Sequence, residues 1–174
     1  KWFKKDMKPF LFLPFEKQKY RITEGWLYSR QERAIHGYTG HGGIDFALPR
    51  GTPVYAPASG WAIASYFSRL VKRQGRIVRY KGKPVGYGLG YFVQIYHPAQ
   101  KVCATCGHLQ AVAAGIKFHA PRKQGSILWP FGHKIRPNRL PYYRYAVWVE
   151  RGRLIGYVGD SGLTWGYSDY PHRP

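Results

Sequence analysis

The chain has 174 residues, 44% of them hydrophobic, which is enough for one domain with a core and short for two. No stretch approaches the roughly 20 apolar residues of a membrane-spanning helix, so the sequence predicts no transmembrane segment. With 28 Lys and Arg against 8 Asp and Glu, the formal net charge of +20 favours polyanionic partners, namely nucleic acid, anionic membranes or envelope polymers, without choosing among them.

The first 19 residues are predicted to form an extended lead-in to the domain. Their basic start has the charge of a signal-peptide n-region, but Pro9 and Pro14 interrupt the apolar run before a full hydrophobic region forms. We therefore do not interpret this stretch as a signal peptide. Residues 20–174 then form a single domain.

Short runs of β-branched and aromatic residues, bounded by many of the 21 Gly and 13 Pro residues, predict an all-β protein with an antiparallel sheet core and long loops. In chain order, the predicted strands cover residues 20–28, 44–48, 54–56, 61–67, 76–80, 91–96, 102–109, 145–149 and 154–158.

The connections between these strands carry their own signals. Turns at residues 49–53 and 58–60 predict a β-meander, and residues 150–153 predict a hairpin turn between the last two strands. The glycine-rich residues 81–90 are expected to separate two strands. Residues 116–141, rich in proline and basic residues, are predicted to form a long loop.

Cys103 and Cys106 are the only cysteines in the chain. One Cys-x-x-Cys pair is insufficient for a zinc ribbon, and the position of His108 does not match the spacing of a haem attachment site. We expect two free, partly buried thiols in or beside a strand.

His41 and Asp45 form the candidate metal-binding motif, in a chain with few carboxylates. Imidazole and carboxylate groups are good zinc ligands. A straight strand would separate the two side chains by about 13 Å, so the backbone between them must curl. Gly42 and Gly43 permit such a curl and make a helical arrangement unfavourable.

Several segments, in the same order, resemble the lysostaphin-like (LytM-type) zinc endopeptidases. These segments are residues 41–47 (HGGIDFA), 51–56 (GTPVYA), 88–97 (GLGYFVQIYH), 107–109 (GHL), 156–162 (GYVGDSG) and 171–172 (PH). The resemblance spans roughly residues 20–172. It implies a sheet that forms a substrate groove, one Zn²⁺ ion, and hydrolysis of peptide bonds in peptidoglycan.

Position by position, the resemblance implies that His41 and Asp45 are zinc ligands and that His108 and His172 are the catalytic imidazoles. One imidazole would take a proton from water and the other would stabilise the oxyanion. The sequence does not determine which histidine has which role. The family's remaining zinc ligand falls at position 174, where the chain has Pro174. We expect the sequence to be a fragment that breaks off within this terminal His-x-His motif, before the last strand.

The remaining histidines are interpreted as structural residues. They are His36, His97, His119 and His133.

The leading hypothesis is therefore a zinc metalloendopeptidase of bacterial cell-wall turnover, located in the cell envelope or outside the cell and acting as a monomer on peptidoglycan. One alternative is an inactive LytM-type domain that binds envelope polymers or regulates another hydrolase. Another alternative is a basic β-domain that binds nucleic acid. We regard nucleic acid as a less favoured partner than peptidoglycan.

Overall fold

The computed structural model describes residues 10–17, 19–25, 42–70, 72–80, 83–84, 86–118 and 144–162. Every regular element within these ranges is a β-strand, which confirms the predicted all-β class. The strands are β1 (Arg21–Glu24), β2 (Asp45–Ala47), β3 (Pro53–Tyr55), β4 (Gly60–Leu70), β5 (Lys72–Arg73), β6 (Arg76–Ile77), β7 (Arg79–Tyr80), β8 (Lys83–Pro84), β9 (Gly86–His97), β10 (Val102–Val112), β11 (Val147–Val149) and β12 (Leu154–Val158). No apolar helix of membrane-spanning length occurs in this part of the chain.

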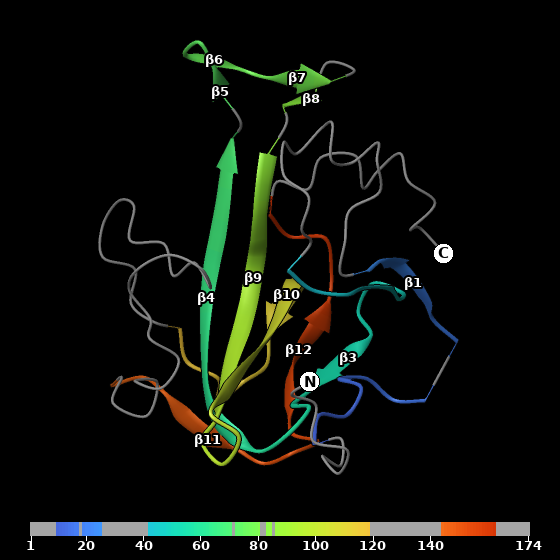
Figure 1. The fold of residues 1–174 in the computed structure, drawn as a ribbon, viewed down its shortest axis with the longest axis vertical. Coiled ribbons are helices and arrows are strands. Elements are labelled where there is room, and N and C mark those ends of the chain that lie inside the picture. The colour runs from blue at the N-terminus through green and yellow to red at the C-terminus, as the bar shows by residue number, and fades with distance from the viewer. Residues whose placement is uncertain are drawn as a thin grey trace, which may run out of the picture.

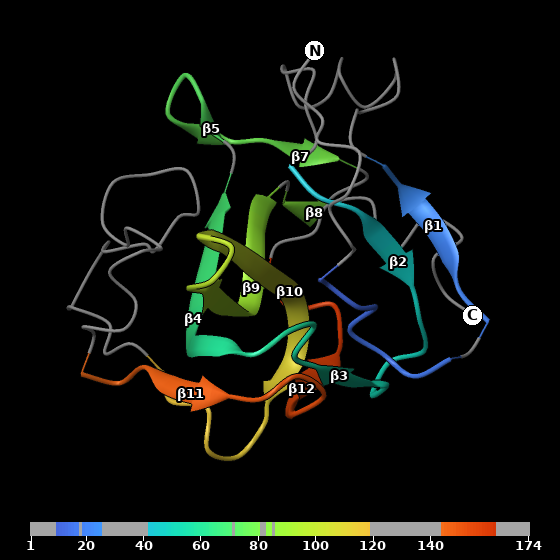
Figure 2. The same ribbon diagram turned by 60° about the horizontal axis from the view of Figure 1, so that its bottom comes forward.

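The central element is a six-stranded antiparallel sheet with the order β11-β4-β9-β10-β12-β3. Its long hairpin, β4 and β9, extends past the other strands (Figure 1). The two small sheets β5-β6 and β7-β8 lie beyond the end of this hairpin (Figure 1). The second view shows β10, β12 and β3 following one another away from β9 (Figure 2).

Apolar side chains are buried on both faces of the central sheet. Because successive residues of a strand point to opposite faces, Ala62 and Ile63 belong to different clusters. The larger cluster includes Ile95, Leu109 and Ile155, each at most 1% exposed. The smaller cluster is built around Phe92 on the opposite face. Because both faces are buried, the sequences of these strands are nearly continuous apolar runs rather than alternating apolar and polar residues.

The lead-in packs against the sheet rather than standing apart from it. The backbone N–H of Phe12 donates to the carbonyl of Pro57, and that of Tyr55 donates to the carbonyl of Pro14. Phe15 is 7% exposed and makes edge-to-face contacts with aromatic side chains of the β1–β2 region. The separate β1-β2 sheet is therefore attached to β3 through this segment.

The predicted meander is wrong. Strands β2, β3 and β4 follow one another in the chain, but β2 pairs with β1, β3 with β12, and β4 with β9 and β11. The glycine-rich residues 86–90 were predicted to separate two strands, but in the structure they form the first part of β9. The predicted loop lies outside the described residues from 119 onward, as do residues 26–28 of the first predicted strand.

The predicted hairpin at residues 150–153 is also wrong, although the turn itself is present. β11 pairs with β4, whereas β12 pairs with β10 and β3. The turn is attached to the β3–β4 connection: the Ser59 hydroxyl donates to Glu150 and accepts from the Arg151 N–H. Gly152 N–H donates to the carbonyl of Ala56. These bonds direct the two strands to different parts of the sheet.

We expect Ile95→Ala to lower the free energy of unfolding by about 2–5 kcal/mol, because it removes buried methyl groups and leaves a cavity. Ile95 is fully buried in the larger cluster. Ile77→Ala is the matched control, since Ile77 is 40% exposed on β6 and should lose far less stability. Urea unfolding of both variants measures the difference, and equal losses would contradict this assignment of the core.

Candidate functional site

His108 lies on β10, as predicted, at a distortion of the strand. Between Cys106 and Leu109 the chain advances three residues while its partner β9 advances two, so β10 carries one extra residue. His108 has a φ of 56°, which is uncommon for a residue other than glycine. Such bulges redirect a side chain, and backbone strain of this kind concentrates at functional sites.

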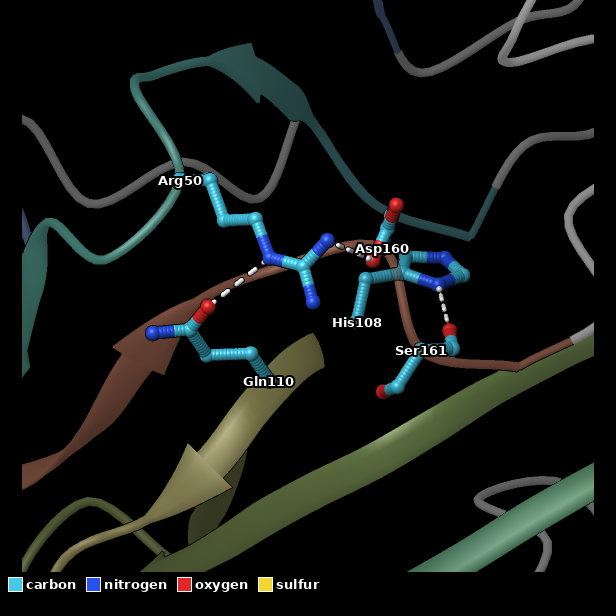
Figure 3. A network of polar contacts seen from close by, with 5 residues as sticks. All are labelled: Arg50, His108, Gln110, Asp160 and Ser161. Carbon is cyan, nitrogen blue, oxygen red and sulfur yellow. Dashed lines mark hydrogen bonds and ion pairs between the residues drawn. The ribbon is translucent and has the colours of Figure 1, made fainter.

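The imidazole of His108 is oriented by the chain that follows β12. Its Nδ1 lies 3.1 Å from the carbonyl oxygen of Ser161 (Figure 3). Because a carbonyl only accepts, Nδ1 carries the proton, and in the neutral ring Nε2 then carries the lone pair. This hydrogen bond therefore selects one tautomer of His108.

Ser161 is in turn held against β9. Its hydroxyl oxygen accepts a hydrogen bond of 2.8 Å from the N–H of Tyr91. The two backbones approach so closely that a Cβ on Gly90 would overlap the Ser161 carbonyl, and one on Gly162 would meet the Gly90 backbone. Glycine at these positions allows the contact that positions the acceptor for His108.

A guanidinium group contacts both segments that hold this histidine. Arg50 Nε donates a hydrogen bond of 2.9 Å to Gln110 Oε1, and its Nη1 is 3.5 Å from Asp160 Oδ1 (Figure 3). Gln110 is two residues after His108, and Asp160 immediately precedes Ser161. The two contacts of Arg50 therefore reach the same two segments that hold the imidazole.

The turn that carries Arg50 is anchored to β12. Thr52 N–H donates to the carbonyl of Pro49, and Gly51, with a φ of 86°, occupies the position where a type II turn needs a positive value. Gly51 N–H also donates to the carbonyl of Val158, whose own N–H donates to Thr52. Arg50 thus extends from a turn with a defined backbone.

Asp45 begins β2 and is half-buried. The chain bends at Gly42 and Gly43 just before it, as the predicted curl requires. The Asp45 carbonyl accepts a hydrogen bond of 3.3 Å from the Thr23 hydroxyl on β1. Pairing with β1 therefore orders the backbone at this candidate ligand.

His41 and His172, the other two predicted site residues, lie outside the described residues. Among the residues that are described, no group of three or more His, Cys, Asp or Glu side chains is arranged to hold a metal ion. Asp45 supplies a carboxylate and His41 would supply an imidazole, a donor pair that suits zinc.

His97 behaves as the structural histidine that the sequence predicts. It is fully buried, and its Nδ1 lies 2.9 Å from the carbonyl of Ser59. This bond ties the end of β9 to the β3–β4 connection. The other three histidines interpreted as structural lie outside the described ranges.

The two cysteines are free and partly buried on β10, as predicted. Because they are three residues apart on a strand, they point to opposite faces: Cys106 packs against the larger cluster and Cys103 against the smaller. Burial raises the pKa of Cys103 to about 11 and that of Cys106 to about 12. At neutral pH in the absence of a metal both groups are therefore protonated thiols.

Three residues of this site were not among those singled out from the sequence. Arg50 lies in a segment interpreted only as a turn, and Gln110 follows a predicted strand. Ser161 belongs to a segment quoted for the family resemblance, in which its side chain was given no role. Asp160, which lies in one of the segments that carry the family resemblance, forms an ion pair with Arg50 in the structure. Arg50, Gln110, Asp160 and Ser161 are identified by the contacts they form in the folded chain, because no sequence pattern links them to His108.

In comparisons with known proteins, no family model, no curated protein and no solved structure matches this chain.

We expect the native protein to resist alkylation by iodoacetamide at pH 8, because the raised pKa values of Cys103 and Cys106 leave little thiolate. Unfolding in urea exposes both thiols and should accelerate labelling by at least about tenfold, since the thiolate is the reactive form. Mass spectrometry measures the two rates. Rapid labelling of the folded protein at either cysteine would contradict the burial described above.

We expect Gly90→Ala to displace Ser161, because the added Cβ would overlap the Ser161 carbonyl and Gly90 has a φ of 59°. The hydrogen bond that fixes the tautomer of His108 would then be lost, and both tautomers should be populated. The ¹⁵N chemical shifts of the His108 ring, which distinguish protonated Nδ1 from protonated Nε2, measure the change. Gly25→Ala is the control, since an added Cβ there meets nothing within 4 Å. Unchanged shifts in folded Gly90→Ala protein would overturn this account.

Proposed function

We propose that the protein is a zinc-dependent endopeptidase that hydrolyses peptide bonds in peptidoglycan, in the cell envelope or outside the cell. The observation that carries this proposal is the conformation of His108. A strand bulge, a left-handed backbone and the Ser161 carbonyl together orient one imidazole in a single tautomer. The resemblance of the surrounding segments to LytM-type enzymes supplies the reaction class.

His41 and Asp45 would hold the zinc ion. When bound, zinc would supply a Lewis acid and a water molecule of lowered pKa, which suits peptide hydrolysis. Asp45 fits this role because it is a half-buried carboxylate directly after a bend, in a chain with only 8 acidic residues. Cys103 and Cys106 point to opposite faces of β10, so the two thiols are not placed to bind one metal ion together.

His108 would act through Nε2, either by accepting a proton from water or by stabilising the negative charge of an oxyanion. With Nδ1–H donating to Ser161, the Nε2 lone pair can accept a proton from water, and the resulting imidazolium can donate a hydrogen bond to an oxyanion. The Ser161 carbonyl stabilises that imidazolium because it accepts from Nδ1. His172 would supply the second imidazole.

The test is zinc-dependent release of peptides from purified peptidoglycan by the protein isolated from its host. We expect a chelator to abolish release, added Zn²⁺ to restore it, and His41→Ala or Asp45→Ala to remove it. His108→Ala should lower kcat/KM by about 10²–10⁴-fold, the usual contribution of a general acid or base. Thr105→Ala, an exposed position on the same strand, is the matched control and should retain activity.

Two results would contradict the proposal. Release that persists after complete removal of zinc, or that survives His108→Ala unchanged, would exclude this mechanism. Binding to peptidoglycan without any release by the zinc-loaded protein would favour the polymer-binding alternative instead.

A further inference from the structure

We propose that Arg50 forms a binding site for a carboxylate of the substrate, next to the imidazole of His108. This inference rests on the proposed function, and it specifies that function further: the preferred substrate is a peptide that carries a free carboxylate near the cleaved bond. The evidence is the way in which the guanidinium is held.

The guanidinium of Arg50 is oriented before any ligand binds. Gln110 accepts from Nε and Asp160 lies beside Nη1, so two of its three nitrogens have partners on two different segments. Nη2 forms no hydrogen bond or ion pair with another described residue, and in Figure 3 this nitrogen is directed between Gln110 and His108. A planar guanidinium held in this way loses less conformational entropy when it binds an anion.

The ion pair with Asp160 leaves Arg50 available for a further anion. The two side chains are 67% and 66% exposed, and exposed ion pairs at 3.5 Å are weak because water screens them. Gln110 is neutral, so its hydrogen bond orients the guanidinium without cancelling the positive charge. No other acidic residue occurs in the sequence between Asp45 and Glu150, a span that includes Arg50, His108 and Gln110.

A carboxylate is the anion that this arrangement suits in a peptide substrate. Guanidinium groups bind planar carboxylates through paired, charge-assisted N–H···O bonds. Arg50 and His108 are linked through Gln110 and through the Asp160–Ser161 segment, so an anion bound at Arg50 would lie beside the reacting groups. Because the turn of Arg50 is bonded to β12, this position is defined by the sheet.

The experiment compares two peptides that differ only in one carboxyl group. Mass spectrometry first identifies the bond that the wild-type protein cleaves in purified peptidoglycan. Cross-linked stem peptides are then prepared with the carboxyl group beside that bond either free or amidated. We expect the wild type to prefer the free carboxylate by roughly tenfold or more in kcat/KM, a typical effect of a charge-assisted contact.

Arg50→Gln should bring the ratio of the two kcat/KM values close to one, mainly by raising KM for the free acid. Arg50 is exposed, so this substitution should leave the fold intact. Arg76→Gln removes an equal charge from exposed β6 and should leave the preference unchanged. A wild type that cleaves both peptides equally, or an Arg50→Gln variant that loses both equally, would overturn the inference.

Calorimetric binding of the same two peptides separates this inference from the proposed function. If the protein cleaves neither peptide but binds the free acid more tightly through Arg50, the carboxylate site stands and the peptidase assignment fails. If it cleaves peptides but Arg50→Gln leaves both binding constants unchanged, the peptidase assignment stands and the carboxylate site is wrong.

Discussion

The close contact between the segment after β12 and strands β9 and β10 is the constraint on which the site depends. Gly90 and Gly162 meet there, and Gly159 lies against the backbone of Gln110 so closely that a Cβ would overlap it. Any larger residue would separate the segments, because backbone atoms cannot move aside as a flexible side chain can. Ser161 therefore stands where its hydroxyl meets β9 and its carbonyl meets His108.

The packed core supports the strands on which this contact is built. Apolar side chains fill both faces of the central sheet, so β9 and β10 cannot shift relative to one another without exposing core residues. Arg50 and Asp160 lie outside the strands, before β3 and after β12, and meet in solvent. This arrangement is typical of sites in which a packed sheet positions groups carried by bulges and turns. Strain at His108 is then tolerated because the neighbouring strands determine its backbone.

Sequence reasoning succeeded where the information is local. Alternating and continuous apolar runs located the strands of the central sheet, and turn residues located most of their ends. It failed for pairing: the meander and the last hairpin were wrong because consecutive strands found distant partners. Ser59, which binds the turn at residues 150–153, is about 90 residues away in the chain, and no local pattern encodes such a bond.

The sequence alone determined the all-β class, the free thiols of β10, the strand position of His108 and the bend before Asp45. These features are local, because backbone preferences and the side-chain period of a strand act over a few residues. Only the tertiary structure decided the tautomer of His108 and the position of Arg50. Both depend on hydrogen bonds between residues about 50 to 60 positions apart, which exist only once the strands have paired.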